Sequence, residues 1–145
     1  MHFMVSNLKT IAVVIAGLFV LFFAAGQQIT TTPISTFYET KTSDEGNVIV
    51  AVTPQALVVG KPPQFEITFT THSGSMDFAV EKIAVLTDGQ GTKYDSAVWE
   101  GSPPGGHHRN GTLTFNKPLL KGGSISLVLQ NISQVLTRKF AWQIP

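Results

Sequence analysis

The chain contains Gln64-Phe-Glu-Ile-Thr-Phe-Thr-Thr71, a run in which apolar and polar residues alternate without a break. In an extended chain, Phe65, Ile67 and Phe69 would point to one face and the residues between them to the other. A period of two over this length is typical of a β-strand that buries one face. The run therefore predicts a strand at the core of a β domain.

Shorter runs of the same kind occur on both sides of this one. They are Val48–Val52, Phe78–Leu86, Lys93–Trp99, Thr112–Phe115, Ser124–Leu129 and Arg138–Gln143, with Gly- and Pro-rich turns at 60–63, 88–89 and 121–123. No segment after residue 47 shows a helical stripe. About seven short strands predict an all-β fold, a two-sheet antiparallel sandwich of immunoglobulin-like type, with a small barrel as the alternative.

The same alternation predicts which side chains form the core of this sandwich. At least six strands would contribute to it, through Phe65, Ile67, Phe69, Val85, Leu113, Phe115, Ile125, Leu127, Leu129, Phe140 and Trp142.

The N-terminal part of the chain has a different character. Ile11–Ala25 is fifteen apolar or glycine residues, preceded by Lys9 and followed by Gly26. As a helix it would span about 23 Å, less than the roughly 30 Å hydrocarbon core of a bilayer. A cleaved signal peptide over residues 1–26 is therefore favoured over a retained anchor, in which residues 8–26 would be the only membrane contact. Either reading places the domain outside the cytoplasm: secreted, periplasmic, or anchored to the outer face of the cytoplasmic membrane.

Residues 27–47 are rich in Thr, Ser and other polar residues and show no periodicity, so they are predicted to be a tether before a domain over 48–145. The 145-residue chain has 10 Lys and Arg against 9 Asp and Glu and no cysteine. This balance provides no broad basic surface for nucleic acid. The absence of cysteine excludes disulfides and thiolate metal sites, so the apolar core has to hold the fold.

A second notable stretch is Trp99-Glu-Gly-Ser-Pro-Pro-Gly-Gly-His-His-Arg-Asn-Gly111. Its two prolines oppose a helix, and Gly105-Gly106 permits positive φ, so a shaped loop between two strands is expected. Together with Thr71–Gly74, Val85–Gly91 and Gly111–Phe115, it resembles a family of uncharacterised exported prokaryotic β-sandwich domains with a Trp-x-Gly-x-Pro-Pro-Gly-Gly-His-His-Arg loop. The resemblance covers Val48 to the C-terminus and implies export and a compact β domain, without an activity.

Three of the four histidines, His72, His107 and His108, follow or precede predicted strands. Counting strands in an antiparallel sandwich places these histidines and Arg109 in one surface patch at one end. With Asp77, Asp88 or Glu100 the histidines could bind copper or zinc. The alternative, which we favour, is that a histidine packs on Trp99 or hydrogen-bonds the loop backbone.

Arg109 and Trp99 also have two interpretations each. Arg109 either binds an anionic ligand or, as base rates favour, pairs with a nearby carboxylate and fixes the loop. Trp99 is either core or a platform for a glycan or a proline-rich peptide, and of Trp99 and Tyr94 at least one should be core.

No catalytic motif is present: the sequence has no Gly-x-Ser-x-Gly, no His-Glu-x-x-His and no phosphate-binding glycine loop, so we do not expect an enzyme. The expected function is an exported binding module that engages a protein, peptide or glycan at the cell surface. Its site would be the loop 99–111, through Trp99, Glu100, His107, His108 and Arg109. The alternative is a copper- or zinc-binding protein that uses His72, His107, His108 and Asp77, and no other cofactor is expected.

Overall fold

The computed structural model describes residues 37–73 and 76–145, and these form nine strands and one helical turn. The predicted signal or anchor segment and the first part of the predicted tether lie outside these residues. The elements are β1 (Lys41–Glu45), β2 (Val48–Ala56), β3 (Gln64–Thr71), α2 (Val80–Ile83), β4 (Ala84–Asp88), β5 (Lys93–Tyr94), β6 (Ala97–Gly101), β7 (His108–Phe115), β8 (Gly123–Ile132) and β9 (Val135–Ile144). Within the described ranges, no helix has the length and apolar character needed to cross a membrane.

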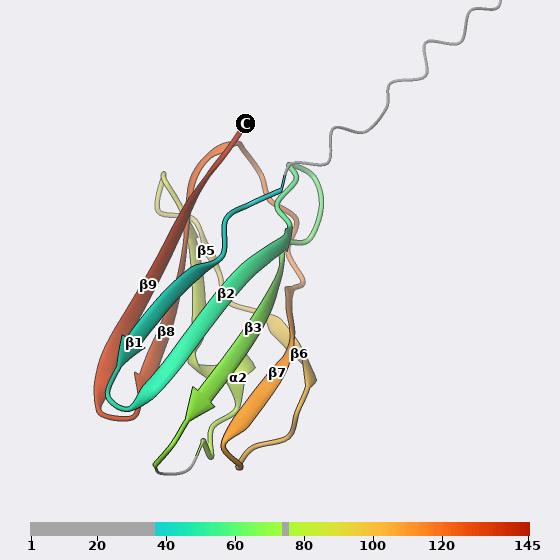
Figure 1. The fold of residues 1–145 in the computed structure, drawn as a ribbon. Coiled ribbons are helices and arrows are strands. Elements are labelled where there is room, and N and C mark those ends of the chain that lie inside the picture. The colour runs from blue at the N-terminus through green and yellow to red at the C-terminus, as the bar shows by residue number, and fades with distance from the viewer. Residues whose placement is uncertain (1–36, 74–75) are drawn as a thin grey trace, which may run out of the picture. The chain divides into compact units, whose positions relative to one another are not determined.

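The strands form two antiparallel sheets that face each other (Figure 1). One sheet has the order β1-β2-β3-β7-β6 and the other the order β5-β4-β8-β9. After the edge strand β1, the remaining strands follow the immunoglobulin pattern, with A, B, E and D in one sheet and C′, C, F and G in the other. The predicted immunoglobulin-like sandwich is confirmed, and the barrel alternative is not.

The core lies between the sheets and follows the period-two pattern of the sequence. Phe65, Ile67 and Phe69 of β3 are fully buried, and so are their counterparts on β7 and β8. Every predicted core residue is buried except Val85. The prediction for Val85 was wrong because its neighbours Ala84 and Leu86 are the residues of β4 that face the other sheet. Tyr94 is also buried, as expected for one of the two large aromatic residues.

The predicted tether was wrong for its last part, because Lys41–Glu45 is the strand β1. β1 has almost no apolar side chain to bury, and hydrogen bonds hold it instead. It pairs with β2 along its whole length, and the buried Arg138 of β9 donates to the Ser43 carbonyl (3.2 Å), the Val48 carbonyl (2.9 Å) and the Glu45 carbonyl (2.6 Å). Local periodicity could not reveal a strand stabilised by a residue more than ninety positions away.

Two further expectations need correction. The segment Phe78–Leu86, expected as one strand, contains the helical turn α2 from Val80 and becomes strand only at Ala84. The loop expected over Trp99–Gly111 is also shorter, because β6 extends to Gly101 and β7 begins at His108.

The connections gather at two opposite ends of the sandwich (Figure 1). We call one of them the histidine end. It contains residues 72–73 and 76–79, the loop 102–107, and the turns at 46–47 and 133–134. We call the other the lysine end; it contains the loops 57–63 and 116–122 and the turn 89–92. This alternation of ends follows from the antiparallel pairing of every neighbouring strand.

Candidate functional site

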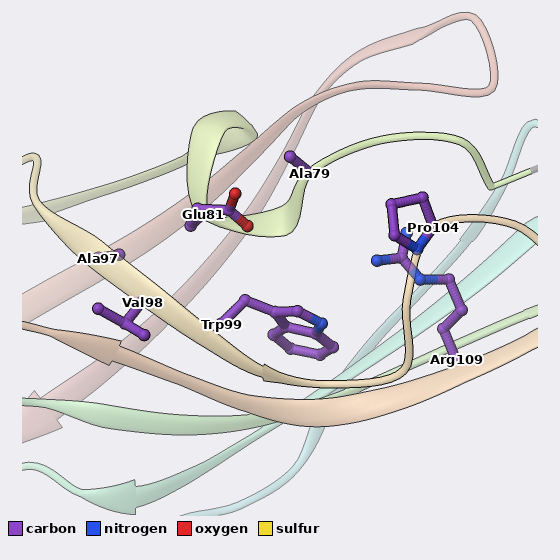
Figure 2. Close-up of a pocket in the computed structure, with 7 residues that line it drawn as sticks. All are labelled: Ala79, Glu81, Ala97, Val98, Trp99, Pro104 and Arg109. Carbon is purple, nitrogen blue, oxygen red and sulfur yellow. The ribbon is translucent and has the colours of Figure 1, made fainter.

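A pocket of about 420 Å³ opens beside β6, between this strand, α2 and the loop 102–107. Most of its lining is apolar, and two charged side chains, Glu81 and Arg109, complete it. In Figure 2 the Trp99 indole lies near the centre of the view, with Glu81 on one side and Pro104 and Arg109 together on the other. The lining residues are Ala79, Glu81, Ala97, Val98, Trp99, Pro104 and Arg109.

The Trp99 indole is held in place by a pair of glycines. Gly101 and Gly111 face each other across β6 and β7, and a Cβ on either would lie within 2.8 Å of Trp99 Cζ2. The indole also meets the Phe69 ring edge-on at 6.3 Å, and its N–H donates to the Ser102 carbonyl at 3.1 Å. Trp99 is therefore a half-buried wall of the pocket with a fixed orientation.

Arg109 is buried, with only 1% of its surface exposed, and it links the loops around the pocket. Its guanidinium donates to the carbonyls of Met76 (2.7 Å), Phe78 (2.9 Å) and Ser102 (3.3 Å), which lie in two separate loops. The amide of Gly105 donates to the same Met76 carbonyl at 3.1 Å. One cation therefore joins β7 to the segment before α2 and to the loop 102–107. The expectation of a surface-exposed Arg109 was wrong, because its donors are directed inward at backbone carbonyls.

Burial outweighs the nearby carboxylates at Arg109, so its pKa lies below its ordinary value. Burial lowers the pKa of Arg109, while the nearby carboxylates of Glu81 and Asp77 raise it. The guanidinium also lies over the Phe78 ring, 4.9 Å from its centroid, a cation–π contact that compensates part of the lost hydration. Its Nε is buried and has no hydrogen-bond partner within the described part of the chain. Of the two charged groups in the lining, Glu81 is the more accessible.

The pocket lies against an open edge of the sandwich. β6 ends the five-stranded sheet in the part of the chain that the structure describes. The hydrogen bonds from Ser102 N to Asn110 O and from Asn116 N to Ser96 O fix which residues of β6 bond to β7. Along an antiparallel pair, residues that bond to the partner strand alternate with residues that do not. The backbone N–H and C=O groups of Ala97, Trp99 and Gly101 therefore point away from β7, to the open edge.

The histidines come together at the histidine end, as the strand count predicted. Thr70 of β3 pairs with His108 of β7, and the Thr71 amide donates to the His107 carbonyl at 2.9 Å, so His72 follows directly beside them. All three histidines are exposed, and His108 Nδ1 lies 3.4 Å from Thr70 Oγ1. None of them lines the pocket.

Asp77 and Glu100 are placed separately. Asp77 is exposed and lies against the loop 102–107, since a Cβ on Gly105 would be 3.3 Å from its Oδ1. Glu100 is exposed on the face of β6 opposite to Trp99, outside the pocket lining. In the ranges 37–73 and 76–145, no three His, Asp or Glu side chains form a group that could hold a metal ion.

Sequence reasoning identified Trp99 and Arg109 but missed the rest of the pocket. Glu81 and Ala79 lie in a segment that carries no motif, and they meet Trp99 only through tertiary packing, while Val98 precedes Trp99 directly in β6. Gly101 and Gly111 both stand in the stretch Trp99–Gly111, but their role as a pair depends on the cross-strand register.

Comparison with known proteins gives no relative: no model of a protein family matches the chain, and no curated protein or solved structure matches it.

Proposed function

We propose that this protein is an exported binding module whose site is the groove formed by β6, α2 and the loop 102–107, and that its ligand is an extended peptide segment of another protein. The apolar N-terminal segment followed by small residues supports export. The domain would then act outside the cytoplasm.

The observation that carries the proposal is the position of the pocket beside the open edge of β6. An extended peptide could pair with the backbone of Ala97, Trp99 and Gly101 and so add a strand to the sheet. In this mode the backbone hydrogen bonds supply affinity, and one side chain enters the neighbouring pocket and supplies specificity. The apolar walls and the accessible Glu81 carboxylate fit an apolar or basic side chain rather than an acidic one.

Arg109 has a supporting role in this proposal. Its guanidinium is occupied by carbonyl groups of the chain itself, so it shapes the groove and does not have to bind the ligand. The pocket is preformed, which lowers the entropy lost on binding.

Selection from a displayed peptide library tests the proposal. We expect enriched peptides to lose binding at least about tenfold to a Val98→Lys variant, because the bulky cation would block both the edge and the pocket. Leu136→Lys is the matched control, since Leu136 is an exposed apolar residue on β9, away from the pocket. A glycan array is run in parallel. Peptides that bind both variants equally, or glycans that bind through Trp99 while no peptide is enriched, would overturn the peptide assignment.

A second candidate is a copper- or zinc-binding function at the histidine end. It is favoured by one observation: the pairing of β3 with β7 brings His72, His107 and His108 to neighbouring positions, although within the described residues these side chains do not already form a group that could hold a metal ion. Imidazole nitrogens suit both metals. Titration of the purified protein with each metal tests it, and stoichiometric binding that His107→Ala removes is the expected result. Absence of uptake would eliminate this candidate without affecting the peptide proposal.

A further inference from the structure

The lysine end exposes apolar side chains in a group. Val58 and Val59 in the loop 57–63 are 50% and 45% exposed, and Leu120 in the loop 116–122 is 55% exposed. The first described residue, Phe37, is 94% exposed, and its neighbour Tyr38 donates a hydrogen bond to the Leu57 carbonyl at 3.1 Å. These side chains therefore belong to one surface at one end of the sandwich.

The two loops form a rigid platform. Val59 and Leu119 form a parallel bridge, Gly60 N donates to Leu119 O at 2.8 Å, and Leu119 N donates to Lys61 O at 3.0 Å. Leu57 and Leu119 are buried and anchor the loops to the core. Because the loops are fixed in this way, their outward apolar side chains cannot fold back onto the domain.

The charge of this platform has one sign. The loops 57–63 and 116–122 contain three exposed lysines, Lys61, Lys117 and Lys121, and no Asp or Glu. Three carboxylates lie in neighbouring segments, and one of them, Asp95 between β5 and β6, is exposed. The other two have partners. Glu39 is paired with Lys41 at 3.2 Å, and Asp88 accepts backbone hydrogen bonds from the turn that it begins.

We propose that the lysine end docks on the surface of an anionic phospholipid bilayer. Exposed apolar side chains surrounded by lysines match the interface of such a bilayer, where the apolar groups enter the acyl boundary and the ammonium groups stay among the headgroups. The chain itself points to this partner. Only residues 26–36 separate the apolar segment Ile11–Ala25 from Phe37, which lies at this end. If the segment is retained in a membrane, this short connection keeps the platform at a high local concentration beside the lipid surface.

The docked orientation has a consequence for the rest of the molecule. The histidine end would point away from the bilayer, and the open edge of β6 would remain accessible from the side. The proposal does not depend on the peptide-binding function, since the two surfaces share no residue.

The experiment uses the full chain in vesicles, with an environment-sensitive dye on Val59→Cys. The chain has no cysteine of its own, so the label is unique. We expect a blue shift and quenching by spin-labelled lipid in vesicles of phosphatidylglycerol and phosphatidylcholine, and neither in phosphatidylcholine alone. A dye on Thr137→Cys, an exposed position near the turn 133–134, is the matched control and should not respond.

Charge variants test the role of the lysines. Lys61→Gln/Lys121→Gln should weaken docking roughly 25-fold, at about fivefold for each lysine. Lys82→Gln/Lys139→Gln makes the same charge change at exposed lysines outside the platform and should have little effect. High salt should weaken docking of the unmodified chain. The proposal fails if the Val59 probe responds equally in both vesicle types, or if the two double variants behave alike. It also fails if the probe shifts without lipid as the protein concentration rises, since a second copy would then cover the surface.

Discussion

Replacing Arg109 by Met tests whether this buried cation stabilises the fold by linking loops through its hydrogen bonds. The side chains have similar length, so the change removes the hydrogen bonds to Met76, Phe78 and Ser102 while leaving most of the volume filled. A hydrogen bond from a charged donor contributes about 1.5–3 kcal/mol. Two acceptors keep a second donor, however: the Met76 carbonyl bonds the Gly105 amide, and the Ser102 carbonyl bonds the indole of β6.

Burying the guanidinium also has a desolvation cost, which Met does not have. Taking these effects together, we expect Arg109→Met to lower the free energy of unfolding by about 2–4 kcal/mol. Arg109→Lys should be at least as harmful, by about 3–5 kcal/mol, because it keeps a buried charge without the planar fork that spans separate carbonyls.

Urea unfolding followed by tryptophan fluorescence measures these changes, and Trp99 and Trp142 report from different sheets. Arg138→Met is the matched control, because Arg138 is equally buried and also bonds backbone carbonyls, but lies away from the pocket. Both Met variants should lose stability, and only Arg109→Met should also weaken peptide binding. If Arg109→Met or Arg109→Lys has the same free energy of unfolding as the unmodified protein, the role of Arg109 in linking the loops is refuted.

Three further changes test the packing and the charges. Gly111→Ala should destabilise the fold by about 1–3 kcal/mol and alter the fluorescence of the β6 tryptophan, because the new Cβ would lie 2.6 Å from backbone atoms. Gly89→Ala, whose Cβ would lie 3.4 Å from its nearest neighbour, should have a much smaller effect. Ile67→Ala should cost about 2–5 kcal/mol and Thr68→Ala far less; equal costs in urea unfolding would contradict the face alternation. Burial raises the pKa of Asp88, but hydrogen bonds from its turn together lower it below the ordinary 3.8. The ionised carboxylate therefore stabilises the fold above pH 3.8, and this stabilisation is lost as the pH falls through the lower folded-state pKa. Asp88→Asn should therefore reduce the acid dependence of the melting temperature, and an unchanged pH profile would contradict this assignment.

The sequence by itself determined the strands of the core and the way in which they alternate between the ends. Phe65, Ile67 and Phe69 repeat with a period of two, and burying one face of such a strand requires a second sheet. The glycines of the loop 102–107 also behaved as expected, since Gly105 and Gly106 have φ of 101° and 77°. These features depend on residues close together in the chain, and local sequence describes such features well.

Only the tertiary structure decided the site. A charged Arg109 beside two histidines is expected at the surface, yet packing directs it at three carbonyls from two other segments. β1 has no apolar pattern, and Arg138 holds it from the far end of the chain. The pocket exists because Glu81, Pro104 and Val98 meet around Trp99, which rests on the Gly101–Gly111 pair. Most of these contacts join residues that are separated in sequence, and their energies depend on register and packing, which no local pattern encodes.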